Sequence, residues 1–173
     1  MAVFAFATML SVSTSAQTTV TFNSNSGSGT MSSQTIAAST TAALTANTFT
    51  RNGMTFMGWD NQATGGSYAY ANKANLTGSS PASTKTLYAR WGYSAAFFNH
   101  CDKASCTGTM LVQVAATTTQ LSPNQYARNV GGRRSCFQNW NTSPGGYGTA
   151  YANMATYTFT ANVNLFAQWL NNC

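Results

Sequence analysis

Residues 49–59 read Phe-Thr-Arg-Asn-Gly-Met-Thr-Phe-Met-Gly-Trp, a pattern typical of β-structure. Its centre, Asn52-Gly53, is a strong signal for a tight turn between strands. The residues beside the turn include Thr, Phe and Trp, which strands favour over helices. We therefore expect a turn at 52–53 that leads into a strand over residues 54–59.

The motifs around this stretch occur twice in the chain. The first half contains Phe56-Met57-Gly58-Trp59, Tyr70-Ala71-Asn72 and Leu87-Tyr88-Ala89-Arg90-Trp91. The second half repeats them as Phe137-Gln138-Asn139-Trp140, Tyr151-Ala152-Asn153 and Leu165-Phe166-Ala167-Gln168-Trp169. The offset between equivalent residues lies between 77 (Phe49 to Tyr126) and 81 (Phe56 to Phe137). What recurs is packing chemistry without a recurrent acid, base or metal ligand, and this pattern indicates a duplicated scaffold.

The duplication predicts two tandem units, over residues 17–93 and 94–173, in a chain of 173 residues. Each unit is small but able to bury a core. Alternation of polar and apolar residues predicts mostly antiparallel strands and little helix, so the expected fold class is mainly β. Residues 40–47 are ambiguous, because their alanines could form a short helical turn that the neighbouring threonines weaken. We expect the hinge between the units at Gly92-Tyr93-Ser94.

The four tryptophans recur as two pairs, Trp59 with Trp91 and Trp140 with Trp169. They could form an aromatic platform for sugar rings. Alternatively, each pair anchors the core of its unit, because a buried tryptophan supplies a large apolar area. We favour the core role, since each tryptophan ends a strand pattern at the same place in both units.

Charge is sparse, with eight Lys and Arg against two Asp and no Glu, which gives a formal net charge of +6. The basic residues are scattered, and only Arg133 and Arg134 are adjacent. A surface that binds nucleic acid usually carries a dense basic stripe, so we expect no nucleic-acid partner. A surface rich in Ser, Thr, Asn and Gln is instead typical of extracellular β-proteins.

The four cysteines, Cys101, Cys106, Cys136 and Cys173, allow three disulfide pairings. We favour Cys101 with Cys106, which closes a small loop, and Cys136 with Cys173, which ties down the C-terminal residues. The rival interpretation is a metal site that adds His100 to three of the cysteines. That site lacks the paired Cys-x-x-Cys motifs of zinc sites, so we expect neither a metal nor a cofactor.

The N-terminal residues 1–16 include the only strongly apolar run of the chain. The run is too short to span a bilayer as a helix, and we expect no transmembrane helix. It is either the remainder of a secretory signal peptide or a retained β-strand with one apolar face that could complete the sheet of a neighbouring subunit. The residues of that face are Phe4, Phe6, Leu10 and Val12. Both interpretations place the protein outside the cytoplasm.

Catalytic constellations are not evident in the sequence. Acid–base chemistry on glycosidic bonds needs two converging carboxyl groups, whereas Asp60 and Asp102 lie in loops that are not equivalent. His100 is the only histidine, and no Gly-x-Ser-x-Gly motif accompanies it. We therefore expect that the chain is not an enzyme.

Three segments together resemble the Listeria–Bacteroides repeat, the type found as B-repeats in internalins. They are Val20-Thr21-Phe22, the stretch 49–59, and Leu87–Trp91. The first copy covers residues 18–91, and the second is degenerate at its front, where an insertion precedes Cys136. The resemblance implies compact β-grasp-like units, an exported bacterial protein and a noncatalytic adhesion or spacer role. The chain departs from the usual pattern by its cysteines.

Two functions follow as expectations. The first is a structural or assembly subunit of a surface appendage or filament, in which N-terminal strand donation joins one subunit to the next. The second is an adhesin-type module that binds carbohydrate or a cell-surface partner. Its candidate contact residues are Tyr68, Tyr70, Tyr147, Tyr151, Arg133 and Arg134, although the tyrosines could equally serve cross-strand packing.

Overall fold

A computed structural model describes residues 16–64, 69–101 and 105–171. The described residues form strands and no helix. The strands are β1 (Gln17–Asn23), β2 (Gln34–Ala37), β3 (Thr41–Ala43), β4 (Thr55–Asp60), β5 (Asn75–Thr77), β6 (Ser83–Phe98), β7 (Ser105–Thr107), β8 (Gln113–Ala115), β9 (Thr118–Gln120), β10 (Ala127–Val130), β11 (Arg133–Asn141), β12 (Ala150–Tyr151), β13 (Thr156–Thr158) and β14 (Val163–Leu170). The fold is mainly β, as the sequence predicts, and the ambiguous residues 40–47 contribute β3 instead of a helical turn.

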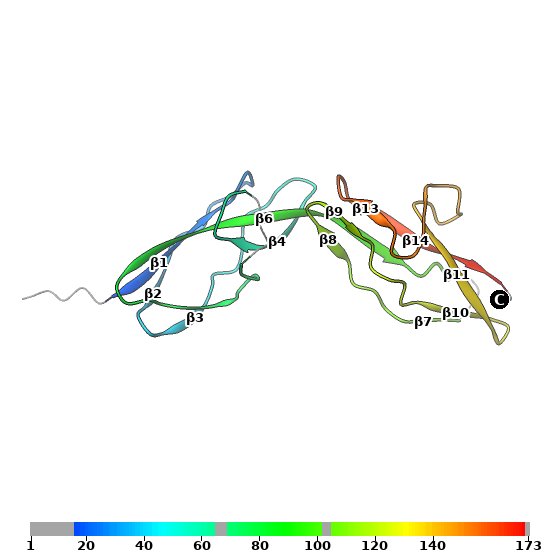
Figure 1. The fold of residues 1–173 in the computed structure, drawn as a ribbon, viewed down its shortest axis with the longest axis horizontal. Helices are drawn as coiled ribbons and strands as arrows, with labels where there is room; N and C mark the ends of the chain where they lie inside the picture. The colour runs from blue at the N-terminus through cyan, green and yellow to red at the C-terminus, as the bar shows by residue number, and fades with distance from the viewer. Residues whose placement is uncertain (1–15, 65–68, 102–104, 172–173) are drawn as a thin grey trace, which may run out of the picture.

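Strand β6 is the centre of the main sheet, whose order is β2-β1-β6-β14-β11-β10-β7. Strands β4 and β8 also pair with β6, and β12 pairs with β11. Two small sheets, β3 with β5 and β9 with β13, complete the pairing. The molecule is elongated, and β6 runs along its long axis from one lobe into the other (Figure 1).

Each of the two units has its own cluster of buried hydrophobic residues. The first cluster includes Val20, Leu87 and Trp59, and the second includes Ala95, Leu165 and Trp140. Alternate residues of β6 enter the first cluster as far as Trp91 and the second from Ala95 onward. We keep 17–93 and 94–173 as the proposed units, and both of them use β6.

The expected hinge at Gly92-Tyr93-Ser94 is wrong, because these residues lie inside the continuous strand β6. Gly92 pairs with Thr55 of β4, while Tyr93 and Ser94 pair with β8. A strand that is paired with partners from both lobes lacks the backbone freedom that a hinge needs. The glycine at position 92 is explained by close packing, since a Cβ there would lie 2.6 Å from the Ala115 oxygen and 2.6 Å from Met57 Sδ.

The two halves of β6 occupy different positions in the two units. Its first half pairs in parallel with β1, from Thr18 opposite Ser83 to Asn23 opposite Tyr88. Its second half pairs in parallel with β14, from Ala95 opposite Val163 to Phe98 opposite Phe166. The last strand of the first unit therefore continues directly as the first strand of the second.

A bulge shapes the tryptophan strand of each unit. The register of β4 against β6 shifts between Phe56 and Gly58, and the register of β11 against β14 shifts between Phe137 and Asn139. Residues three apart in a regular strand point to opposite faces, but an extra residue in a bulge reverses that alternation. Phe56 and Trp59 consequently pack ring against ring, with centroids 4.9 Å apart.

Candidate functional site

The inner tryptophan of each unit lies at the centre of three aromatic rings. Trp59 has no exposed surface, and its ring centroid lies 4.9 Å from Phe22, 6.1 Å from Phe49 and 4.9 Å from Phe56. Tilted and edge-to-face arrangements at these distances are favourable beyond the burial of apolar area.

Trp140 repeats this arrangement in the second unit with closely similar ring distances. It is fully buried, and its ring lies 4.9 Å from Phe97, 6.2 Å from Tyr126 and 4.9 Å from Phe137. Within the described part of the chain, the indole Nε1 atoms of Trp59 and Trp140 are buried and have no hydrogen-bond partner. Their contribution to stability is thus apolar packing.

The outer tryptophans are equivalent to each other and less deeply placed. Trp91 is 6% exposed and Trp169 is half-buried. Trp91 Nε1 donates to the Ser24 oxygen and Trp169 Nε1 donates to the Asn99 oxygen, both at 2.9 Å. Each indole therefore fixes the backbone that follows the first strand of its unit.

Side-chain amides form a second repeated feature, which the sequence reasoning missed. The Gln34 side-chain oxygen Oε1 accepts from the backbone N–H of Thr45 at 2.9 Å, and Gln113 Oε1 accepts from the backbone N–H of Ser122 at 2.8 Å. The backbone N–H of Asn47 donates to the side-chain oxygen Oδ1 of Asn72 at 2.9 Å. These amides hold irregular backbone in place where no strand partner is available.

The asparagine contact is also duplicated, because the backbone N–H of Asn124 donates to the side-chain oxygen Oδ1 of Asn153 at 2.8 Å. Asn153 lies 81 residues after Asn72, and Gln113 lies 79 residues after Gln34. These offsets fall within the range that the aromatic motifs define. Checking every polar residue for a partner at that offset would have found them.

A shallow groove lies beside the outer tryptophan of each unit. The first has a volume of about 620 Å³ and the second about 410 Å³. The linings of the two grooves contain equivalent aromatic residues, which are Phe56 and Trp91 in the first and Phe137 and Trp169 in the second. Arg51 lines the first groove and Arg134 lines the second. A lining that combines aromatic and basic side chains can contact a sugar ring or an anionic group.

The proposed contact residues do not gather on one patch. Arg133 and Arg134 begin β11 and are exposed, whereas the loop carrying Tyr147 follows the other end of that strand. A nine-residue strand is about 30 Å long. Tyr147 is 96% exposed.

Two further candidate tyrosines, Tyr70 and Tyr151, are partly buried. Tyr70 bridges to Trp59 through the backbone, and Lys85 Nζ lies 5.7 Å from the centre of its ring. Tyr151 packs edge-on against Tyr157 at 5.3 Å. Tyr68 lies outside the described residues.

Burial affects two of the tyrosine side chains. It raises the pKa of Tyr126 above the ordinary value of 10.0, and a backbone hydrogen bond with Met110 opposes part of that shift. The Tyr126 hydroxyl donates to the Phe97 oxygen at 2.8 Å. Burial likewise raises the pKa of Tyr157, with Tyr151 adding to the effect. Both phenols are therefore neutral near pH 7.

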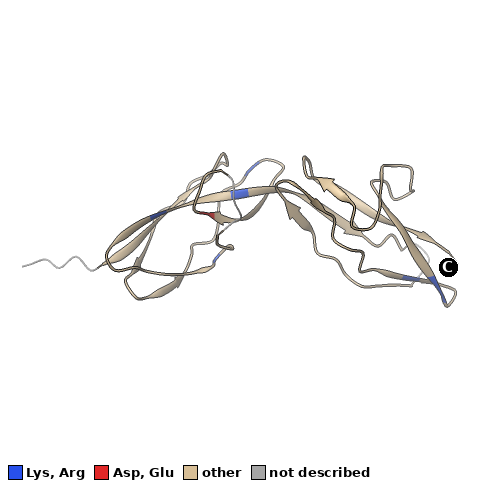
Figure 2. Cartoon of the chain, in the orientation of Figure 1, with Lys and Arg blue, Asp and Glu red and all other residues tan. Residues whose placement is uncertain are grey.

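Among the described residues, the charged side chains are spread along the molecule and do not form a basic stripe (Figure 2). Asp60, which is 6% exposed, follows Trp59 directly, and its Oδ2 atom lies 3.8 Å from Arg90 Nε. The equivalent positions in the second unit hold Asn141 and Gln168. Asn141 is 2% exposed and accepts from the Ser143 and Gly148 amides at 2.9 Å. One unit therefore uses a charge pair where the other uses neutral amides.

This difference predicts the outcome of a double-mutant cycle. Arg90→Gln alone leaves the buried carboxylate of Asp60 without its cation and should lower the free energy of unfolding by about 1–3 kcal/mol. Asp60→Asn combined with Arg90→Gln reproduces the second unit and should restore most of that loss. Urea denaturation of the four proteins measures the coupling. Strictly additive losses would contradict the pairing.

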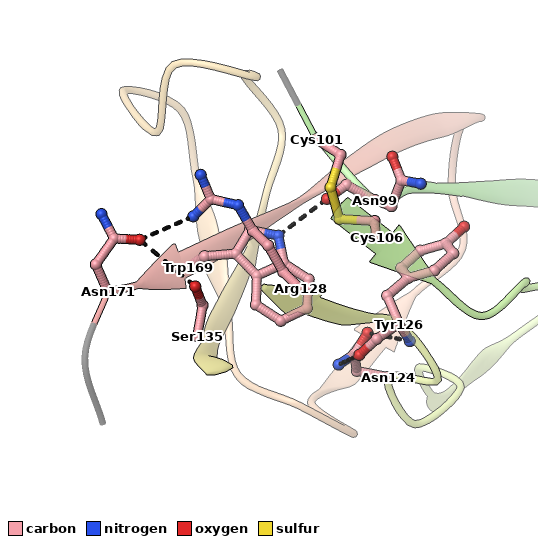
Figure 3. The surroundings of a disulfide bond; sticks show 9 residues. All are labelled: Asn99, Cys101, Cys106, Asn124, Tyr126, Arg128, Ser135, Trp169 and Asn171. Carbon is pink, nitrogen blue, oxygen red and sulfur yellow. Dashed lines mark hydrogen bonds between the residues drawn. A yellow bond between two sulfur atoms is a disulfide. The ribbon is translucent and has the colours of Figure 1, made fainter. Parts of the chain in front are cut away.

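A disulfide closes the far end of the second unit (Figure 3). It joins Cys101, which follows β6, to Cys106 in the edge strand β7, with the Cα atoms 6.1 Å apart. This pairing is the one the sequence favoured. Cys136 is also disulfide-bonded, and its expected partner Cys173 lies outside the described residues.

The bond holds a short edge strand, which also pairs with β10 at each of its three positions. In β7, Cys106 pairs with Arg128 of β10, and Arg128 Nη1 donates to Asn171 Oδ1 at 3.1 Å. The Asn99 oxygen that accepts from Trp169 lies two residues before Cys101. The disulfide thus connects the end of β6, the edge strand and the outer tryptophan.

Loss of this disulfide should weaken the edge of the sheet. Replacing Cys101 and Cys106 with serine should lower the free energy of unfolding by about 2 kcal/mol, because closing a loop of this length has that entropic value. Hydrogen exchange should accelerate at β7 and β10. The amides of β1, in the other unit, are the internal control. Equal acceleration in β1 would argue against a local role.

The described residues do not bring together three or more side chains of the kind that hold a metal ion. No helix in the described ranges has the length and hydropathy needed to cross a membrane. The segment 1–16 with its apolar face at Phe4, Phe6, Leu10 and Val12 lies outside the described residues, apart from Ala16.

Comparison with known proteins identifies the repeated unit. The family model of the Listeria-Bacteroides repeat domain matches residues 19–90 and 107–168. Comparisons with curated proteins and with solved structures give no match. Both matched ranges contain the inner tryptophan of a unit, and together they cover more than half of the chain. The chain therefore belongs to the Listeria-Bacteroides repeat domain family.

Proposed function

We propose that the protein is a noncatalytic structural subunit of an extracellular bacterial surface assembly. Its two units form an elongated body in which β1 and β14 lie toward opposite ends of the long axis (Figure 1). The main support for this proposal is the continuity of β6, which runs from the core of the first unit into the core of the second. Such a body spans distance without a flexible joint, and repeats of this family are typical of extracellular and surface proteins.

The proposed mode of assembly is donation of the N-terminal segment to a neighbouring subunit. The main sheet ends at β2 on one side and at the three-residue strand β7 on the other. Edge strands present unpaired backbone groups that accept a further strand. A strand from the β1 end added to β7 of the next subunit makes a head-to-tail contact, which propagates into a filament when the rotation does not close.

Deletion of residues 1–16 tests this mode. The full chain should form filaments or higher oligomers by electron microscopy and light scattering, and the shortened chain should remain monomeric. Circular dichroism and a thermal midpoint equal to that of the full chain provide the control for folding. Filaments that persist after the deletion would exclude strand donation. A full chain that never assembles would exclude the filament role.

A second candidate function, an adhesin-type module, draws support from the duplicated grooves. Aromatic residues at equivalent positions line both grooves, and each groove also has an arginine in its lining, as expected for a bivalent carbohydrate-binding surface. A glycan array should then give hits that weaken on Arg51→Ala with Arg134→Ala. Lys73→Ala, an exposed cation outside both grooves, is the matched control. An array without hits at low and physiological salt would contradict binding of carbohydrate.

A further inference from the structure

We infer that the fold bears tension along its long axis, with β1, β6 and β14 acting as parallel strands that are loaded in shear. This inference rests on the structural role proposed above for its biological meaning, but the mechanical property follows from the topology alone. A stretched surface assembly transmits force through each subunit, and the path of that force depends on how the outermost strands are paired.

The first junction is between β1 and β6. The two strands run in the same direction and pair at six positions, from Thr18 opposite Ser83 to Asn23 opposite Tyr88. A pull on the start of β1, away from the second unit, drags β1 lengthwise along β6. The backbone hydrogen bonds between the strands run across that direction and are evenly spaced, so they share the load and must fail together.

Side chains reinforce this junction. The Thr21 and Thr86 hydroxyl groups lie 3.0 Å apart, and the Thr18 and Ser83 hydroxyl groups lie 3.1 Å apart. Val20 is fully buried between these contacts. Sliding β1 by one residue would bring its buried face to the solvent side, which adds a packing cost to the loss of hydrogen bonds.

The second junction repeats the geometry at the other end of the body. Strand β14 runs parallel to β6 and pairs with it from Val163 opposite Ala95 to Phe166 opposite Phe98. Its later residues pair with β11, as far as Leu170 opposite Cys136. A pull on the end of β14 therefore also acts along the strands. Between the two junctions the load passes through the covalent backbone of β6.

The same strands offer little resistance to a pull in another direction. The starts of β1 and β6 lie side by side, because Thr19 pairs with Thr84. Separating these two starts would peel β1 from β6 and break the hydrogen bonds one after another. The parallel arrangement thus predicts strong anisotropy, with high resistance along the body and low resistance across it.

Single-molecule force spectroscopy on the full chain tests the inference. Handles attached through an azide-bearing amino acid at Gln17 and Leu170, both exposed, load the molecule along its axis. Handles at Gln17 and Thr84, also exposed, peel β1 from β6. At one loading rate, the axial rupture force should exceed the peeling force several-fold, since forced rupture follows the unfolding barrier along the direction pulled. An axial force equal to or below the peeling force would overturn the inference.

A third attachment separates the two junctions. Handles at Thr84 and Leu170 load β6 and β14 but leave β1 unloaded, and their rupture force should again exceed the peeling force. A low value here would overturn the claim for β14. All three proteins carry substitutions only at exposed positions, so each is expected to fold as the wild type does. If the chain forms filaments but the axial and peeling forces are equal, load bearing is rejected and the assembly role stands. If the forces differ as expected but no filaments form, the assembly role is rejected and load bearing stands.

Discussion

Replacing Trp140 with alanine is expected to lower the free energy of unfolding by about 3–5 kcal/mol. The side chain has no exposed surface, and its removal leaves a cavity among Phe97, Tyr126 and Phe137. Phe97 and Phe137 are held in strands and cannot collapse fully into the space, so the cost includes both the lost burial of the indole and the cavity left behind. Chemical denaturation followed by circular dichroism measures the change.

Two comparisons make this prediction specific. Trp59→Ala should cost a similar amount, because the aromatic distances in the first unit match those in the second. Tyr147→Ala removes a large aromatic side chain that is 96% exposed, and it should change stability by about 0.5 kcal/mol or less. A loss for Trp140→Ala no larger than that of Tyr147→Ala would show that the indole does not anchor a core.

Replacing Gly92 with valine is expected to destabilise the protein by about 3 kcal/mol or more, at the upper end of the effects of overpacking. The first atom added, Cβ, would meet the Ala115 oxygen and Met57 Sδ at 2.6 Å each. The Ala115 oxygen belongs to the backbone of β8, which cannot move aside without breaking its pairing with β6. The substitution should therefore disturb both units at their junction. Thermal and urea denaturation report the loss.

The matched control is Thr84→Val on the same strand. Thr84 is exposed, and valine is favoured in strands, so stability should change by about 0.5 kcal/mol or less. Gly92→Ala should fall between the two variants. A Gly92→Val protein as stable as the wild type would mean that β4, β6 and β8 do not meet at Gly92 as described.

The sequence alone predicted what depends on local pattern and repetition. The alternation in residues 18–22 predicts a strand there, and β1 covers it. Cys101 and Cys106 are close enough along the chain that their pairing could be expected. The repeated aromatic motifs predicted two copies of one family domain, which the family match confirms.

Features that depend on tertiary pairing could not be predicted from pattern. Gly92 followed by Tyr-Ser looks like a linker, and its place inside β6 is visible only when Ala115 and Met57 are seen to press on it. Strict alternation would place Phe56 and Trp59 on opposite faces, and the bulge that reunites them is a property of the pairing with β6. Parallel pairing of β1 with β6 joins residues that are 65 positions apart, beyond any local signal.

The continuity of β6 can be tested by the distance between spin labels placed at its two ends. Labels attached through noncanonical amino acids at Ser83 and Phe98, both exposed, avoid the native cysteines. A single extended strand between these positions corresponds to about 45–50 Å, allowing for twist. Pulsed electron paramagnetic resonance should give one narrow distribution at that distance. A broad distribution, or one centred well below that range, would mean that the two units are joined by a flexible linker at residues 92–94 and do not share a strand.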